Sequence, residues 1–543
     1  MMNGKEHKFL KSKTHFLIPI ATTTLIFLLL AWFVIQMIND YMVQTSHLIR
    51  TIDYHGELGK FSLSNHNDMT TQITFWGSIA LILIVSILFF SLTSLGKKSG
   101  DVYKLAYFDA LTDLPNSDYF KTSWDIKRAI DKNLHIKKNV YFINCVNFKL
   151  INMTSGYQIG DEVLRQISAR LKSHLPNQIE MYRLTADRFI LVQDTQIHTI
   201  KIHEMIALIT NAFNEPFKHS EGKKSIGMHI AIISSKDLNC NANDVLRKCL
   251  ISMDHLKLSN DKHQVIYNRE IEEAFYRESL IESELRDLID GKDTDRLYLL
   301  YQPQYALGTK EIVGTESLAR FNSKHLGLIS PLEFISIAEK KQLIVQLGRI
   351  ILLEACKYAK MIADLGLHSL RVAVNVSPIQ LLDDHFTSTF ISIVEETGCS
   401  FNQLEIEITE SAVMENFDIV NSKLQYLREQ GVLISLDDFG TGYSSLYRLQ
   451  TLAIDSVKLD KRFINDIEEH EAVALITKEI IKMSHIMGLK VVAEGIETEH
   501  QKSFLEKHKC DFGQGYLFSH PLTAVEMLAS LVTDKIRRLG LNL

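Results

Sequence analysis

The chain has 543 residues, of which 46% are hydrophobic and 23% are charged. This length predicts three or four units of ordinary domain size rather than one core. The net charge of -6, without a long basic stripe, argues against direct binding of nucleic acid. The six cysteines include no CxxC pair, so structural disulfides and a zinc site are not expected.

Two apolar stretches lie near the N-terminus, at residues 16–38 and 73–95. Each is long enough to cross about 30 Å of hydrocarbon as a helix. Lysines are concentrated before the first stretch and after the second, whereas the intervening segment carries few cations. Because positive charges stay on the cytoplasmic side, residues 1–104 are predicted to form a membrane anchor with two transmembrane helices, cytoplasmic termini and a short periplasmic loop.

The next segment, residues 105–267, alternates strand-like apolar runs with helical sequence, which predicts a compact α/β domain. Charged, helix-favouring sequence follows over residues 268–295. Its apolar residues Phe275, Ile281 and Leu285 share one helical face. This pattern predicts a connecting helix whose opposite face is solvated.

From residue 296 to 543, strand, polar strand end and helix recur. Repeated βα units of this combined length predict a parallel sheet that closes into a TIM-type (β/α) barrel. On the strand around residues 404–409, alternation separates Ile406 and Ile408 from Glu405 and Glu407. The acids should therefore face the barrel axis, where they repel one another unless metal ions compensate their charge.

Polar residues end several successive strands of this predicted barrel. Each one alone has an ordinary explanation, such as a turn, a helix cap or a surface ion pair. Parallel strands, however, bring their carboxyl ends to one rim of a barrel. The set therefore predicts one site, made of Asn375, Glu407, Asp437, Asp438, Lys458 and Glu494.

Ordered motifs over residues 297–527 resemble the EAL-type cyclic di-GMP phosphodiesterases. They are YQPQ, GTESLAR, NVSPIQ, LEIEITES, LDDFGTGYSSL, VKLD, VVAEGIE and QGYLFSHPL. The resemblance implies hydrolysis of cyclic di-GMP to linear pGpG with two divalent cations, Mg²⁺ or Mn²⁺. Such ions suit hard oxygen ligands, activate water and disperse charge on the leaving oxygen. The signature Glu-Ala-Leu reads Glu316-Ser317-Leu318 here, and we expect this change to have a modest effect.

The resemblance also implies roles for individual residues. Glu316, Asn375, Glu407, Asp437, Asp438 and Glu494 would be metal ligands, and Lys458 and Glu494, with Glu316, would be catalytic. Substrate contacts would come from Gln302, Arg320, Asp460 and Gln514, supported by Glu410 and Glu497.

The middle domain resembles the GGDEF diguanylate cyclases through YFDALTDLPN, NFKLIN and GYQIGDEVL. At the family's defining turn, Thr185, Ala186, Asp187 and Arg188 stand in place of two glycines and two acids, and Asn144 replaces a metal aspartate. Added side chains obstruct approach to phosphate, and an isolated acid cannot hold a pair of cations. We therefore predict a degenerate cyclase site.

Asn152 and Asp161 match the family's guanine contacts, so weak GTP binding stays open. The resemblance further implies a homodimer and, with the predicted anchor, a multi-pass protein of the bacterial inner membrane with cytoplasmic catalytic domains. Two alternatives to a pure phosphodiesterase are a non-catalytic cyclic di-GMP receptor and a two-way enzyme that also makes cyclic di-GMP. Both are disfavoured, because the EAL-type motifs lack no metal ligand and the cyclase turn is damaged.

Overall fold

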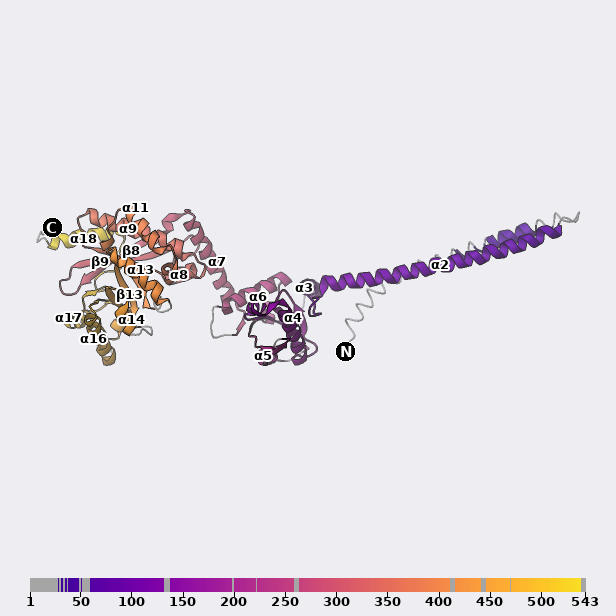
Figure 1. Cartoon of the computed structure of the whole chain (residues 1–543), viewed down its shortest axis with the longest axis horizontal. Coiled ribbons are helices and arrows are strands. Elements are labelled where there is room, and N and C mark those ends of the chain that lie inside the picture. Colours follow the sequence, from indigo (N-terminus) through magenta and orange to yellow (C-terminus); the bar gives the residue numbers. More distant parts are fainter. Residues whose placement is uncertain are drawn as a thin grey trace. The chain divides into compact units, whose positions relative to one another are not determined.

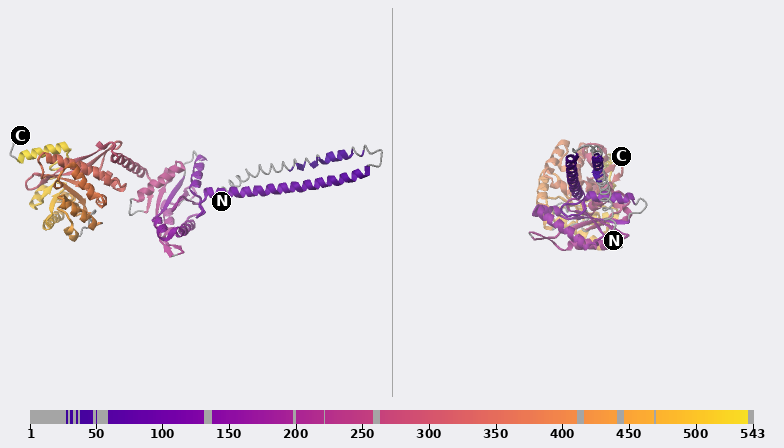
Figure 2. Two further views of the ribbon diagram at one scale, coloured as in Figure 1. Left: turned by 45° about the horizontal axis from the view of Figure 1, so that its top comes forward. Right: turned by 90° about the vertical axis from the view of Figure 1, so that its right-hand side faces the viewer.

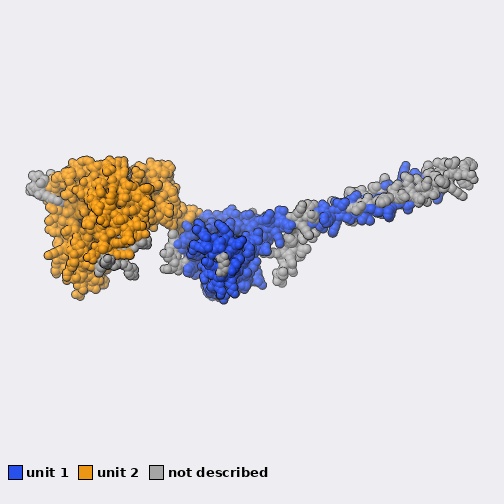
Figure 3. All heavy atoms as spheres, in the orientation of Figure 1, with its two compact units in different colours: residues 1–268 blue, residues 269–543 orange. Residues whose placement is uncertain are grey.

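The computed structural model describes residues 38–47 and a few other positions between 28 and 50, and then 59–130, 137–197, 200–220, 222–257, 263–410, 416–440, 446–468 and 470–538. The chain divides into two compact units between Asn268 and Arg269 (Figure 3).

Helix α2 (Gly59–Tyr107) contains the second stretch predicted to cross a membrane. Across the described residues, no helix combines the length and apolar content that a membrane span requires. The predicted transmembrane helix at 73–95 and the inner-membrane location are therefore wrong for the described residues, and the predicted membrane association finds no support in them. The prediction relied on the apolar character and length of the stretch, in which Ser78 and Thr93 donate hydrogen bonds to carbonyls of the preceding turn. Most of the stretch at 16–38 lies outside the described residues.

The first unit continues from α2 as an α/β domain. Its elements are α3 (Ser117–Ile130), β1 (Lys138–Cys145), α4 (Phe148–His174), β2 (Glu180–Arg183), β3 (Arg188–Asp194), α5 (Ile202–Asn214), β4 (Phe217–His219), β5 (Gly222–Lys224), β6 (Met228–Ile233), α6 (Ala242–Lys257) and β7 (Gln264–Ile266).

In the described part of this unit, five strands form a sheet in the order β2-β3-β1-β6-β7, with β1 antiparallel to both of its neighbours. Side chains of β1 alternate between two cores. Tyr141 and Ile143 pack in a cluster with residues of α4 and α5, whereas Val140 and Phe142 pack with residues of α3 and α6. Helices therefore cover both faces of the sheet (Figure 2).

The second unit contains α7 (Arg269–Ile289), β8 (Leu297–Ala306), β9 (Ile312–Ser323), β10 (Gly327–Ile329), α8 (Pro331–Lys340), α9 (Ile344–Asp364), β11 (Arg371–Asn375), α10 (Pro378–Leu382), α11 (Phe386–Thr397), β12 (Leu404–Thr409), α13 (Phe417–Glu429), β13 (Leu433–Phe439), α14 (Leu446–Thr451), β14 (Ser456–Leu459), α15 (Lys461–Asn465), α16 (Glu471–Ile486), β15 (Lys490–Ala493), α17 (Glu499–Lys507), β16 (Phe512–Gly513) and α18 (Ala524–Arg538).

Its described strands close into a barrel, since β8 pairs with both β9 and β16. The strands lie inside a layer of helices that includes α9, α11 and α13 (Figure 1). This agrees with the predicted (β/α) barrel. Ile406 and Ile408 of β12 are buried in the core shared with these helices, as the alternation predicts.

Two strands depart from the predicted parallel sheet: the short β10 runs antiparallel to β9, and β8 runs antiparallel to both of its neighbours. The connection from β8 to β9 holds only the residues between Ala306 and Ile312. A connection this short joins antiparallel strands, whereas parallel strands need a crossover of a dozen residues or more.

Helix α7 packs its apolar face on the barrel unit. Ile281 and Leu285 are fully buried in one cluster with Phe321 of β9 and Phe334 of α8. On the neighbouring face, Glu278 pairs with Lys340 at 2.6 Å. Helix α7 thus forms part of the second unit rather than a free linker.

Candidate active site

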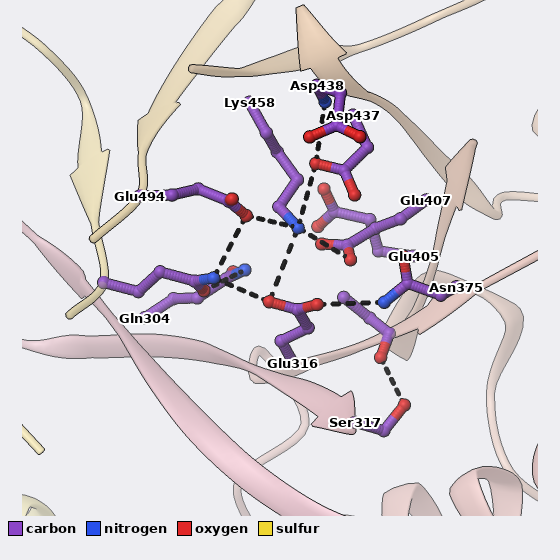
Figure 4. A network of polar contacts seen from close by, with 12 residues as sticks. Gln304, Glu316, Ser317, Asn375, Glu405, Glu407, Asp437, Asp438, Lys458 and Glu494 are labelled. Atoms are coloured by element: carbon purple, nitrogen blue, oxygen red, sulfur yellow. Dashed lines mark hydrogen bonds and ion pairs between the residues drawn. The ribbon is translucent and has the colours of Figure 1, made fainter. Parts of the chain in front are cut away.

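A fully buried lysine lies at the centre of the barrel mouth. Lys458 of β14 is 1% exposed, and its Nζ lies 2.7 Å from Glu494 Oε1 and 2.8 Å from Glu407 Oε2 (Figure 4). Glu316 Oε2 and Asp437 Oδ1 each lie 3.4 Å from the same nitrogen. Burial opposes the charged ammonium, but these carboxylates outweigh it and hold the pKa of Lys458 well above its usual value.

The sheet register explains why these groups meet. In the parallel ladder Asn375 of β11 lies beside Glu407 of β12, and Thr409 at the end of β12 lies beside Asp437 of β13. Strand ends therefore align at one rim, as expected for parallel barrel strands. Glu494 follows directly after β15, and its N–H donates to Leu459 O of β14 at 3.1 Å.

The four carboxylates have different environments. Glu316 accepts hydrogen bonds from Gln514 Nε2 at 2.6 Å and from Asn375 Nδ2 at 2.9 Å. Burial alone would raise the pKa of Glu316, but Lys458 and these donors lower it. Burial raises the pKa of Glu494 to about 7 despite the attraction of Lys458, with Asp437 adding to the rise.

Glu407 is the least compensated acid of the cluster. It is 1% exposed, and burial followed by the charge of Glu316 raises its pKa well above the usual value. Among the described residues, neither of its carboxylate oxygens has a partner with hydrogen-bond geometry. Its approach to Lys458 is therefore an ion pair by distance, without a well-aligned hydrogen bond.

Asp437 and Asp438 end β13 in a local irregularity. The ladder with β14 shifts register between Leu436 and Phe439, and Asp438 takes a left-handed φ of 55°. Its N–H donates to Asp437 Oδ1 at 3.0 Å. Burial, followed by the charge of Asp437, raises the pKa of Asp438 to about 6.

The predicted substrate-contacting residues Gln302, Arg320 and Asp460 differ in their burial and in their hydrogen-bond partners. Gln302 is buried and donates to Ser519 O at 3.2 Å, while Arg320 is partly exposed. Asp460 caps α15 by accepting from Arg462 N at 2.8 Å, and Asp438 lies within hydrogen-bonding reach of it.

The two predicted supporting acids differ. Glu410 is buried and accepts from Gly440 N at 3.2 Å, next to the end of β13. Glu497 is exposed in the loop after β15, outside the contacts of the cluster around Lys458, and its N–H donates to Gln501 Oε1 at 2.7 Å. Glu410 therefore contacts the end of β13 next to the site, whereas Glu497 is exposed.

The donors fit a hard divalent cation in chemistry, and the orphaned oxygens of buried Glu407 show a need for positive charge. Their present arrangement is centred on an ammonium. In the part of the chain that the structure describes, no group of three or more acidic, histidine or cysteine side chains is arranged around a common ion position. Glu316, Glu407, Asp437 and Glu494 instead converge on Lys458 Nζ.

One buried polar residue near the site, Gln304, was missed in the sequence, whereas Glu405 was predicted to face the barrel axis but was given no role. Gln304 of β8 donates from Nε2 to Gln514 Oε1 at 3.2 Å. Glu405 lies deeper in the barrel, where it pairs with Arg371 at 3.2 Å and accepts from Ser456 at 3.1 Å. The available signal was strand alternation, which puts Gln304 on the same side of β8 as Gln302.

Comparison with known proteins assigns both units. The EAL domain family matches residues 282–521, and the family "Diguanylate cyclase, GGDEF domain" matches residues 106–263. The "Bifunctional diguanylate cyclase/cyclic di-GMP phosphodiesterase MucR" of Pseudomonas aeruginosa is 30% identical over 83% of this chain and 67% of its own length. The chain belongs to the GGDEF-EAL proteins. Its first unit contains the GGDEF domain and its second unit the EAL domain.

Two further relatives match both domains. The "Signaling protein YkoW" of Bacillus subtilis is 31% identical over 89% of this chain and 61% of its own length. The "Cyclic di-GMP phosphodiesterase PdeR" of Escherichia coli is 30% identical over 78% of this chain and 62% of its own length. The chain thus spans less than two thirds of the length of these two proteins.

In the GGDEF unit, the predicted site residues lie around the turn from β2 to β3. Asn144 of β1 lies opposite Arg188 on β3 and opposite His229 on β6. Ala186 takes a left-handed φ of 55°, and its carbonyl accepts from Arg183 Nη2 at 2.8 Å. Burial raises the pKa of Asp187 despite the cationic groups near it.

The other predicted residues of the degenerate cyclase site are Thr185 in this turn and Asn152 and Asp161 on α4. Thr185 is exposed beside Ala186, and Asp161 is exposed on α4. Asn152 Oδ1 lies 2.1 Å from where a Cβ at residue 160 would stand, so a side chain at that position would displace the Asn152 amide.

Proposed function

We propose that the EAL unit hydrolyses cyclic di-GMP to linear pGpG with two divalent cations, Mg²⁺ or Mn²⁺. The observation that carries this proposal is the buried ammonium of Lys458 ringed by four carboxylates. Membership of the EAL family and the similarity to PdeR and MucR support the choice of substrate.

In this proposal, Glu316, Asn375, Glu407 and Asp437 hold one cation, and Asp437, Asp438 and Glu494 border the second. Such cations supply Lewis-acid activation of water and compensate charge on the leaving oxygen. Bound positive charge would also satisfy the carboxylate of Glu407, which lacks well-aligned hydrogen bonds from described residues.

The chain's own groups have distinct tasks in the proposed reaction. Lys458 lowers the pKa of Glu316, opposes the rise in the pKa of Glu407 and Glu494, and stabilises negative charge that develops on the attacking oxygen. Glu494, with a pKa of about 7, is suited to accept the proton of the attacking water as the new P–O bond forms. The ribose oxygen leaves as the old P–O bond breaks and takes up a proton from the surrounding water. Gln302 and Arg320 would contact the dinucleotide.

The GGDEF unit is proposed to regulate or dimerise rather than to catalyse, with boundaries at residues 105–267. Asn144 supplies no charge where the family has a metal ligand, and Arg188 puts a cation on the facing strand. The turn from β2 to β3 carries the side chains of Thr185 and Ala186, which restrict the approach of a phosphate group.

The test is incubation of the full chain with cyclic di-GMP, and separately with GTP, in Mg²⁺ or Mn²⁺, with products resolved by chromatography. Linear pGpG from the first incubation is the expected result, and Glu316→Gln should reduce its formation at least about 100-fold. Intact cyclic di-GMP that stays bound would indicate a receptor instead. New cyclic di-GMP from GTP would show that the GGDEF unit is a cyclase.

A further inference from the structure

Gln304 is hydrogen-bonded to Gln514, the glutamine that contacts two acids of the cluster. Gln514 Nε2 donates to Glu316 Oε2 at 2.6 Å and to Glu494 Oε1 at 3.2 Å, so one amide group links two carboxylates. The opposite end of the same amide, Gln514 Oε1, accepts from Gln304 Nε2 at 3.2 Å. Gln304 is 2% exposed and is labelled beside the cluster in Figure 4.

The direction of the Gln514 amide matters because its two ends have opposite polarity. With Nε2 towards the acids it stabilises their ionised forms, whereas Oε1 in that place would repel them. The backbone of Gln514 is already held, since its N–H donates to Ala493 O at 2.9 Å and its carbonyl accepts from Ile496 N at 3.1 Å. The remaining freedom is rotation of the side-chain amide, which the donor at Gln304 restricts.

We propose that Gln304 is a positioning residue that fixes the Gln514 amide and thereby holds Glu316 and Glu494 in place as metal ligands. This inference rests on the proposed function, because it assigns the two carboxylates to the cation site. Gln304 acts through Gln514, and its side chain does not contact either acid in the described hydrogen bonds.

The first test measures Mn²⁺ affinity of the full-length chain by the electron paramagnetic resonance signal of free Mn²⁺. Gln304→Leu keeps a side chain of similar size but removes the donor to Gln514. Loss of a group that orients metal ligands weakens metal binding by about 10-fold or more, and we expect a change of that size.

A matched control is available in the same unit. Gln403, just before β12, is 1% exposed, and its amide atoms have no hydrogen-bond partner among the described residues. Gln403→Leu makes the same chemical change at a buried glutamine away from Lys458. Its Mn²⁺ affinity should equal that of the wild type, and an equal loss in both variants would overturn the inference.

Gln304→Glu gives a second readout through its pH profile. The introduced carboxylate can only accept when ionised, so it would draw Gln514 Nε2 away from the acids; when protonated, it can donate as the amide does. The loss in Mn²⁺ affinity and in turnover, relative to wild type, should therefore deepen as pH rises. A ratio to wild type that is constant with pH would contradict the inference.

The outcomes separate this inference from the proposed function. Wild-type hydrolysis together with unchanged Mn²⁺ affinity in Gln304→Leu overturns the inference alone. Weaker Mn²⁺ binding in Gln304→Leu, with no hydrolysis by the wild type, supports the inference and removes the proposed activity. A wild type that binds no Mn²⁺ overturns both the inference and the proposed cation site.

Discussion

At the residue scale, the site depends on one cation surrounded by several anions. Lys458 lies within 3.4 Å of four carboxylates and is 1% exposed. Water therefore has little access to the groups around Lys458 and cannot take over its role of compensating their negative charge. The acids and the lysine therefore stabilise one another only as a set. Removing either the positive charge or one of the negative charges should therefore strongly reduce turnover and stability.

Lys458→Met keeps the length of the side chain but removes its charge. We expect turnover of cyclic di-GMP to fall at least about 100-fold and the EAL unit to lose about 3–5 kcal/mol of unfolding free energy, because the buried acids lose their counter-ion. The control is Lys490→Met, since the Lys490 side chain is 62% exposed in its pair with Asp511. An exposed pair contributes about 1 kcal/mol or less. Near-wild-type turnover and stability in Lys458→Met would contradict this account.

The acidic cluster also predicts how pH affects the metal-free protein. Burial raises the pKa of Glu494 to about 7, above the unfolded value of about 4.3. The folded state then holds the proton more tightly, so this contribution to stability is present below the unfolded pKa and is lost as pH rises through about 7. In EDTA, calorimetry should show a lower Tm for the EAL unit near pH 8 than near pH 5, and Mn²⁺ should reduce the difference. A Tm in EDTA that increases from pH 5 to pH 8 would contradict this prediction.

At the element scale, α7 illustrates how an apolar helical face finds a partner. Ile281 and Leu285 repeat at helical spacing and pack on β9 and α8. Ion pairs such as Glu278 with Lys340 and Lys341 lie beside this contact. Because exposed ion pairs stabilise weakly, the apolar cluster should supply most of the docking energy.

Leu285→Ala should lower the unfolding free energy of the EAL unit by about 2–5 kcal/mol, since Leu285 is fully buried. Leu332→Ala is the matched control, because Leu332 at the start of α8 is 86% exposed. Denaturant unfolding followed by circular dichroism measures both variants. Equal stabilities for the two would show that α7 does not contribute its apolar face to the core.

At the scale of the whole molecule, the hydrophobic clusters follow the division into two units. Two clusters consist of residues before Asn268 and two of residues after Arg269. Each unit therefore has its own core, which is the physical requirement for independent folding.

A fragment of residues 269–543 should fold and keep the chemistry of the EAL unit, whereas a fragment of residues 296–543 should be less stable. The shorter fragment lacks α7 and exposes Leu297, Phe321 and Phe334 to water. Thermal unfolding of the two fragments, with binding of Mn²⁺ as a second readout, makes the comparison. Equal Tm values would place the boundary of the folding unit after α7.

Much of the barrel could be predicted because its signals are local. Alternation along β12 separates Ile406 and Ile408 from Glu407 within a few residues, and strand ends of a parallel barrel share one rim. The convergence of Glu407, Asp437 and Glu494 on Lys458 follows from these two rules, whereas Glu316, inside β9, was expected there only from the resemblance to the EAL-type family.

Tertiary structure decided what depends on residues far apart in the chain. The antiparallel β8, the Gln304 to Gln514 bond and the exposure of Glu497 are set by which segments pair and pack. Hydropathy also misled in α2, where an apolar stretch of sufficient length was taken to predict a membrane span. A sequence determines the local periodicity of its side chains, but electrostatic and hydrogen-bonding energies depend on distances that only the folded chain establishes.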